Sequence, residues 1–117
     1  MKKRFVLIPP ARDEFAALLL GLQVELRGVV KVLEENGTLE YPDGQLVDNE
    51  ARIFEMRVHD DEQQGRVLYY YWNGNNVIYG LVVFVKKTRR TPHGQIELAQ
   101  KRLKQLKNGK WRDKEEE

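Results

Sequence analysis

The sequence predicts an α+β fold in which a small antiparallel sheet of consecutive strands is combined with helices at both ends. A helical hydrophobic period covers residues 13–35, an alternating strand period begins at Ile53, and a helical period returns after Pro92. Separate runs of helix and strand favour an α+β arrangement over an alternating α/β one. The 117 residues are enough for one such domain and too few for two.

The N-terminal part is expected to form a short strand followed by two helices. Phe5–Ile8 is apolar and stops at Pro9-Pro10, so it is too short for a signal peptide or a membrane span and suits a first strand. Gly21 lies inside the helical region, which favours a break near it and therefore a helical hairpin. Asn36-Gly37 is a typical helix stop.

The rest of the chain is expected to form three antiparallel strands and a last helix. Residues 37–52 are predicted as a loop with a turn at Pro42-Asp43-Gly44. Asn73–Asn76 is a strong hairpin signal. The predicted strands are Ile53–Val58, Arg66–Trp72 and Val77–Val85, and the predicted helix runs from about Pro92 to Leu106.

We expect one domain over residues 1–108 and a charged tail over residues 109–117. The helices are expected to pack against one face of the sheet. The other face, together with the basic turn that follows the last strand, is then expected to form an open groove. Without a signal peptide or membrane span in the sequence, we expect a cytoplasmic protein that does not bind membranes.

The missing residue types exclude several kinds of active site. The chain has no cysteine and no serine, so thiolate metal ligands, disulfides and serine nucleophiles are excluded. His59 and His93 are the two histidines, and they are too isolated to predict a zinc site. Phosphate-binding loops and dinucleotide motifs are also missing. We therefore expect no metal and no cofactor.

The charges are distributed unevenly along the chain. Residues 1–85 carry a net charge of −4, residues 86–112 carry +9, and residues 113–117 carry −3. A block of one sign indicates a polyanionic partner, although a solvated helix face could have the same composition. The charge alone does not decide between these two interpretations.

Cleavage of RNA by its own 2′-hydroxyl is a reaction that the available residue types can support. The RNA supplies the nucleophile, so the protein needs only to move protons and to neutralise charge on the phosphate. Arg binds phosphate bidentately, and a Lys or Tyr crowded by cations has a lowered pKa that suits a general base. The candidate catalytic residues come from neighbouring strands and are Arg57, Arg66, Lys86 and Lys87.

Further residues are candidates for RNA binding, and each has an ordinary alternative. Arg57 could instead form a surface ion pair with Glu55 or Asp60, and the helix-start histidine could simply be exposed. Alternation along the second strand sends some of its tyrosines into the core. The RNA-binding candidates are Thr88, Arg89, Arg90, Tyr70 and His93.

Three segments resemble a known family of toxins. They are similar to motifs of the phage-derived, HigB-like branch of the RelE/ParE superfamily, and the preceding helical hairpin fits as well. Met56 stands where that pattern has leucine, a volume-conserving change, and Val83 stands where it has glycine. The segments are Ile53–Arg57, Arg66–Tyr70 and Phe84–Pro92, followed by Ile96, Ala99 and Arg102.

The resemblance implies a RelE-like fold and the toxin of a type II toxin–antitoxin pair. Such toxins cleave mRNA on the ribosome and are silenced by a small antitoxin, often a helix-turn-helix protein. By motif, Arg57 and Arg66 match two strand arginines of the family, and Lys86, Lys87 and Thr88 match its basic turn. Two alternatives remain open, namely a non-catalytic gyrase inhibitor like the ParE branch and an inactive, phage-derived RNA-binding accessory protein.

Overall fold

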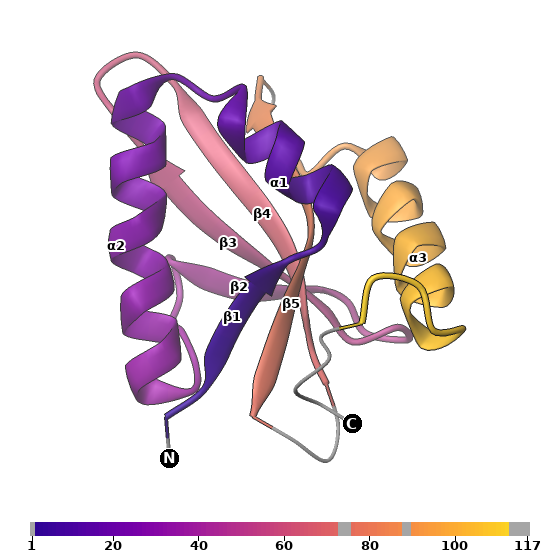
Figure 1. The fold of residues 1–117 in the computed structure, drawn as a ribbon. Helices are drawn as coiled ribbons and strands as arrows, with labels where there is room; N and C mark the ends of the chain where they lie inside the picture. Colours follow the sequence, from indigo (N-terminus) through magenta and orange to yellow (C-terminus); the bar gives the residue numbers. More distant parts are fainter. Residues whose placement is uncertain (1, 73–75, 88–89, 113–117) are drawn as a thin grey trace.

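A five-stranded sheet forms the centre of the computed structural model, which describes residues 2–72, 76–87 and 90–112 (Figure 1). In chain order the elements are β1 Arg4–Leu7, α1 Pro9–Ala16, α2 Leu20–Asn36, β2 Gly44–Asp48, β3 Ile53–His59, β4 Gln64–Tyr71, β5 Val77–Lys86 and α3 His93–Lys107. The predicted α+β fold, with its three-stranded antiparallel meander, N-terminal helical hairpin and C-terminal helix, is confirmed.

The sheet extends beyond the predicted meander on both sides. Its order is β1-β5-β4-β3-β2, in which β1 pairs with β5 in parallel and all other neighbours are antiparallel. The meander β3-β4-β5 therefore lies in the middle, where strands are apolar on both faces. This matches the buried residues along most of β4 and β5.

The N-terminal helices separate at residues 17–19, just before Gly21. Helix α2 ends where Gly37 adopts a φ of 78°, a left-handed conformation that glycine tolerates without strain, and the Gly37 N–H donates to the Leu33 carbonyl at 2.7 Å. Some of the apolar residues that gave the helical period are buried against the sheet. The buried ones on α2 are Leu22, Leu26 and Leu33.

The sequence did not predict β2, because residues 37–52 lack the hydrophobic period of a strand. β2 is an edge strand whose two apolar residues, Leu46 and Val47, are adjacent rather than alternating. A register shift between Leu46 and Asp48 interrupts its pairing with β3. β2 matters for the site below because it places Gln45 opposite Glu55.

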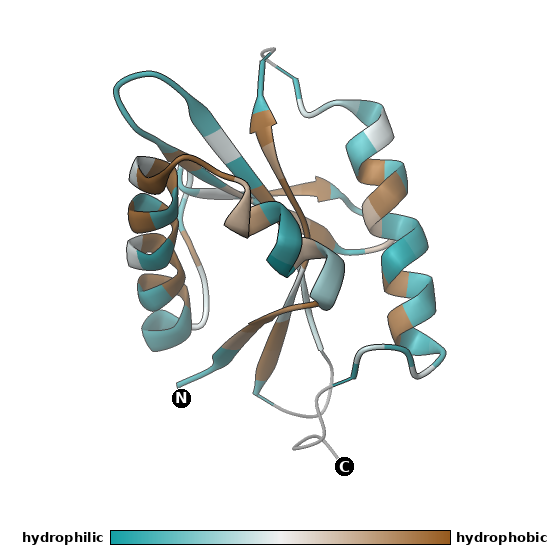
Figure 2. Cartoon of the chain, turned by 45° about the horizontal axis from the view of Figure 1, so that its top comes forward, coloured by the Kyte–Doolittle hydropathy of each residue, from teal (hydrophilic) through white to brown (hydrophobic). Residues whose placement is uncertain are grey.

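The helices lie on both faces of the sheet, whereas the sequence analysis placed them on one face (Figure 2). A Cβ atom at Gly65 of β4 would lie 3.6 Å from Leu22 of α2, while Lys107 Nζ of α3 lies 5.1 Å from the ring centre of Tyr70 on the same strand. Positions 65 and 70 point to opposite faces because strand residues alternate. The expectation was wrong because a helical period shows that a helix has a buried side, but not which face of the sheet that side covers.

A bulge in β5 anchors α1 and α3 at the edge of the sheet. Leu81 is the extra residue of the bulge, and its carbonyl accepts a hydrogen bond from Arg102 Nη1 at 2.8 Å. Arg102 also binds both carboxylate oxygens of Glu14 at 2.9 Å. Glu14 in turn accepts the backbone N–H of Val83 at 3.0 Å. These contacts hold the first and last helices in one frame around β5.

Candidate RNA-binding and catalytic site

Three cations lie close together on one face of the sheet. Helix α3 covers the opposite end of the same face. Arg57 and Arg66 lie directly opposite each other in the register of β3 and β4, and Lys86 lies opposite Gln64 in the register of β4 and β5. Strand alternation therefore points all three cationic side chains to the same face. They line an open cleft of about 760 Å³, here called the cationic cleft, together with Glu62, Gln63, Gln64, Val85 and Lys87.

Arg57 is the strand arginine that faces the cleft most openly. Its side chain is 27% exposed, and its Nε donates to Glu55 Oε1 at 3.2 Å. The guanidinium carbon lies 5.5 Å from the ring centre of Tyr41. Because only Nε has a hydrogen-bond acceptor among the described residues, the two terminal nitrogens are available for a phosphate.

Arg66 is held more tightly and is only 7% exposed in its side chain. Its Nη1 donates to the Gly65 carbonyl and its Nη2 to Gln64 Oε1, both at 2.9 Å. Its buried Nε has no hydrogen-bond acceptor in the described part of the chain and lies 3.7 Å from Glu55 Oε1. Burial lowers the pKa of Arg66; the charge of Glu55 opposes this effect and that of Arg57 adds to it.

Lys86 ends β5 and is 8% exposed. Burial is the main cause that lowers the pKa of its ammonium group, and the nearby charges of Arg66 and Arg57 lower it further. The carboxylate of Glu55 acts in the opposite direction. A lysine with a lowered pKa is neutral more often near pH 7 and can then accept a proton.

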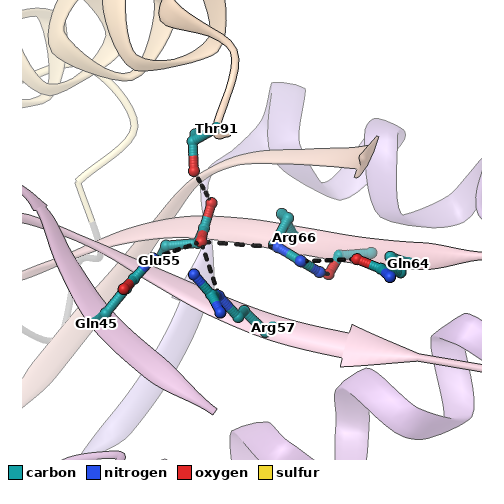
Figure 3. A network of polar contacts seen from close by, with 7 residues as sticks. Gln45, Glu55, Arg57, Gln64, Arg66 and Thr91 are labelled. Atoms are coloured by element: carbon teal, nitrogen blue, oxygen red, sulfur yellow. Dashed lines mark hydrogen bonds and ion pairs between the residues drawn. The ribbon is translucent and has the colours of Figure 1, made fainter. Parts of the chain in front are cut away.

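Glu55 is the centre of this cluster, and the sequence analysis did not include it among the site residues (Figure 3). It is fully buried. Its Oε1 accepts hydrogen bonds from Gln45 Nε2 at 3.3 Å and from Arg57 Nε, and its Oε2 accepts the hydroxyl of Thr91. Strand alternation puts positions 55 and 57 on one face and is the sequence signal that points to Glu55. The sequence allows an ion pair between Glu55 and Arg57, but as a surface contact.

The basic turn contributes to the cleft at its first two positions. Lys86 is buried and Lys87 is exposed, and both line the cationic cleft. Thr88 and Arg89 lie outside the described residues. Arg90 is exposed. The positive charge of the turn therefore begins inside the cleft and continues towards α3.

Two predicted RNA-binding residues are not brought to the cationic cleft. Tyr70 is 9% exposed and lies on the same face, four residues further along β4, where Lys107 of α3 covers its ring. His93 is the first residue of α3. Its side chain is 84% exposed, and its Nε2 lies 3.4 Å from Glu97 Oε1. Neither residue lines the cleft.

Tyr41 is an aromatic residue near the cleft that the sequence analysis missed. It is 73% exposed and follows α2 in the loop before β2. An exposed aromatic ring beside an arginine can stack on a nucleobase. Tyr41 lies in a loop without a hydrophobic period, so the sequence gives no signal for it. Its link to the strand cations is a contact with Arg57 in the folded chain.

Val83 and the acidic loop between β3 and β4, Asp60–Glu62, affect the cleft differently. Val83 pairs with Val67, so it faces away from the Arg57 side and does not narrow the groove. In the acidic loop, Asp60 Oδ1 accepts the backbone N–H groups of Glu62 and Gln63 at 2.9 and 2.7 Å. Glu62 lines the cleft and places one carboxylate at its rim.

The cluster suits charge stabilisation and proton transfer. Among the described residues, no group of His, Cys, Asp or Glu could hold a metal ion. Within the same part of the chain, no helix is long and apolar enough to cross a membrane. The cleft offers a half-buried arginine, a buried arginine, a buried lysine and an exposed lysine around one buried carboxylate.

Comparisons with known proteins concern the family and the fold of the chain. A family described as "Phage derived protein Gp49-like" matches residues 13–104. A search of curated protein sequences gave no match. The fold is similar to that of the E. coli toxin RelE, solved in the free state as a mutant with two arginines replaced by alanine. The TM-score is 0.63 at 13% sequence identity, and the alignment covers 91% of this chain and 99% of that chain. At this identity the likeness concerns the fold.

Proposed function

The chain belongs to the family of phage-derived Gp49-like proteins, and from this membership we propose that it is the toxin of a type II toxin–antitoxin pair. We propose that it cleaves mRNA on the ribosome, in the cytoplasm, as an endoribonuclease. The observation that carries the proposal is the cationic cleft, where Arg57, Arg66 and Lys86 meet on a RelE-like fold. Such a cleft suits the phosphate backbone of RNA.

In the proposed reaction the RNA attacks itself. The 2′-oxygen forms a bond to the adjacent phosphorus, and the bond between phosphorus and the 5′-oxygen breaks. Neutral Lys86 accepts the proton of the 2′-hydroxyl, a role supported by its burial and lowered pKa. The leaving 5′-oxygen takes a proton from water, which gives a 2′,3′-cyclic phosphate and a 5′-hydroxyl.

The arginines and Lys87 stabilise the charge that develops on the phosphate. Arg57 points two free nitrogens of its guanidinium at the cleft and is the proposed bidentate phosphate contact. Lys87 is exposed at the mouth and adds a second positive charge. Arg66 is mostly buried, so it acts through its charge, which favours anionic RNA and disfavours protonated Lys86.

RNA binding is proposed to extend from the cleft in two directions. Arg90 adds an exposed positive charge after the basic turn, while Thr88 and Arg89, which lie outside the described residues, stay predicted RNA-binding residues. Tyr41 offers a stacking surface beside Arg57. Tyr70 and His93 do not line the cleft, and their part in RNA binding stays a prediction.

The proposed protein partner is a small antitoxin, and a second cleft offers a surface for it. This cleft, here called the apolar cleft, measures about 770 Å³ and has no acidic residue among those that line it. An apolar floor with a basic rim suits an acidic, amphipathic segment of a partner protein. Its lining comes from β1, α1, α2 and the C-terminal turn and comprises Arg4, Phe5, Val6, Leu7, Pro9, Arg12, Phe15, Leu26, Arg27, Val30, Trp111 and Arg112.

Mapping of mRNA ends in a translating extract tests the proposed activity. The parent protein should produce new 5′ ends inside the reading frame, and Arg57→Ala should lower their yield by about 10²-fold, the usual effect of removing one charge-stabilising donor. Arg27→Ala, which removes an arginine from the other cleft, should cut normally. Intact mRNA at a dose of parent protein that stops translation would overturn the proposal. Growth arrest with DNA breaks and intact mRNA would instead indicate the gyrase-inhibitor alternative.

A further inference from the structure

We propose that Glu55 is a positioning residue, which fixes the direction of the Arg57 guanidinium and tethers the segment before α3 to the cationic cleft. The inference rests on the proposed function for its role in RNA cleavage. The structural part, that one buried carboxylate orders the cations around it, is independent of that function. Glu55 itself is fully buried and therefore does not touch RNA.

A fully buried carboxylate is stable only when its oxygens have partners. The donors to Glu55 come from three segments of the chain: Gln45 from β2, Arg57 from β3 and Thr91 from the segment before α3. Arg66 of β4 adds an ion pair at 3.7 Å. Glu55 thus joins four segments at a single point, which an ordinary surface ion pair does not do.

Glu55 also allows two like charges to face each other across neighbouring strands. Arg57 and Arg66 are direct partners in the register of β3 and β4, and like charges in that position destabilise a sheet. Glu55 Oε1 lies 3.2 Å from Arg57 Nε and 3.7 Å from Arg66 Nε, so one oxygen faces both guanidinium groups. Without this negative charge, the half-buried Arg57 would turn away from the buried Arg66.

The direction of Arg57 follows from which of its nitrogens Glu55 binds. Binding at Nε leaves the two terminal nitrogens at the far end of the guanidinium, directed into the cleft. The second oxygen of Glu55 accepts the Thr91 hydroxyl, which fixes the chain just after the basic turn. The two oxygens therefore position the phosphate-binding arginine and the end of the turn separately.

The steady-state kinetics of Glu55→Gln test this role, with Glu62→Gln as the matched control. Both changes remove one negative charge and keep nearly the same side-chain shape. Glu62 lines the cleft, is exposed and, among the described residues, holds no arginine, whereas Glu55 is buried beside the cleft. Glu55→Gln should lower kcat by about 10²-fold, the effect of a misplaced catalytic group, while KM stays the same or falls. Glu62→Gln should keep the kcat of the parent. Equal kcat for Glu55→Gln and the parent would overturn the inference.

The pH profile gives a second reading that a loss of packing would not produce. The charge of Glu55 raises the pKa of Lys86, so its removal should move the rise of kcat with pH to lower pH. Glu62→Gln should move the midpoint less. A Glu55→Gln profile with the parent midpoint would count against the inference.

A spectroscopic measurement on folded protein separates this inference from the proposed function. The Nε–H signal of Arg57 should be resolved and slowly exchanging in the parent and in Glu62→Gln, and should broaden or shift to the free-arginine position in Glu55→Gln. If Glu55→Gln fails to fold, Thr91→Val tests the tether alone: it should keep the Arg57 signal and lower kcat. An unchanged Arg57 signal in Glu55→Gln, or an unchanged kcat in Thr91→Val, contradicts the inference. Lack of RNA cleavage by the parent contradicts only the proposed function.

Discussion

The cationic cleft and the apolar cleft have nearly the same volume, about 760 and 770 Å³, but they hold their arginines in different ways. In the cationic cleft, Arg66 and Lys86 are buried around the buried carboxylate of Glu55. In the apolar cleft, Arg12 and Arg27 are exposed at the rim of an apolar floor. The guanidinium carbon of Arg27 lies 5.4 Å from the ring centre of Phe15.

The difference shows that the size of a cleft does not identify its chemistry. Buried cations are expensive to keep charged, so they shift pKa values and remain only where a partner stabilises them. Exposed arginines around an apolar floor favour a protein partner. The two clefts are therefore proposed to serve two ligands, RNA in one and a protein segment in the other.

The largest expected effect comes from the base in the cationic cleft. Lys86→Arg keeps the positive charge but stays protonated, so cleavage should fall by about 10²–10⁴-fold. For the parent, the pKa of Lys86 lies below that of a free lysine because the side chain is buried, and the neutral form is the proposed active one. The cleavage rate should therefore rise with pH up to that lowered pKa and then level off.

Rates measured across a pH series check this prediction, with Lys101→Arg on the exposed side of α3 as the control. The control should follow the parent curve, whereas Lys86→Arg should show a low, flat profile. A pH-dependent rise that survives in Lys86→Arg would assign the proton transfer to another group.

The next largest effect is expected from breaking the contacts of Arg102, which link α3 to α1 and β5. Arg102→Ala removes two charge-assisted bonds to Glu14 and one to the Leu81 carbonyl. The side chains are 12% and 28% exposed, and the loss leaves Glu14 without its cation, so the free energy of unfolding should fall by about 2 kcal/mol. Urea unfolding measures this change. A variant as stable as the parent would mean that α1 and α3 pack without this link.

A charge reversal in the apolar cleft should separate partner binding from cleavage. Arg27→Glu should weaken inhibition by the proposed antitoxin about tenfold, in the range of an arginine at a protein interface, and leave RNA cleavage unchanged. Lys104→Glu on α3 makes the same charge change outside the apolar cleft and should keep normal inhibition. Titration of cleavage with the partner distinguishes the two. Equal loss in both variants would indicate a response to net charge only.

The smallest expected effect concerns base stacking near the cationic cleft. Tyr41→Ala should raise KM roughly fivefold, equivalent to about 1 kcal/mol, with little change in kcat. The value is at the low end for stacking because Tyr41 is 73% exposed. Tyr41→Phe keeps the ring and should behave like the parent. A Tyr41→Ala variant with parental KM would remove this residue from the RNA path.

The sequence predicted the elements whose hydrophobic period is strong. β3, β4, β5 and α3 lie within a few residues of their predicted bounds, since their buried faces leave a regular pattern. β2 and the parallel pairing of β1 with β5 were not predicted. β2 lies at an edge with little buried surface, and the pairing of β1 depends on a crossover that no local pattern encodes.

The same limit applies to the site. Arg57, Arg66, Lys86 and Lys87 could be proposed because strand alternation and the charge block mark them. Glu55 was missed as a site residue because a carboxylate in a strand is expected at the surface. Its burial results from contacts with Gln45 and Thr91, which come from parts of the chain that the sequence assigned to loops.

The central claim, that the cationic cleft cuts RNA through the 2′-hydroxyl of its substrate, is tested most directly by one substituted substrate. An mRNA with a single 2′-deoxy nucleotide at the mapped cut is offered to the parent protein in a translating extract. We predict no cleavage at that position, with normal cleavage at other positions and 2′,3′-cyclic phosphate ends on the fragments. Cleavage at the deoxy position, at the rate of the unmodified mRNA, would contradict the account.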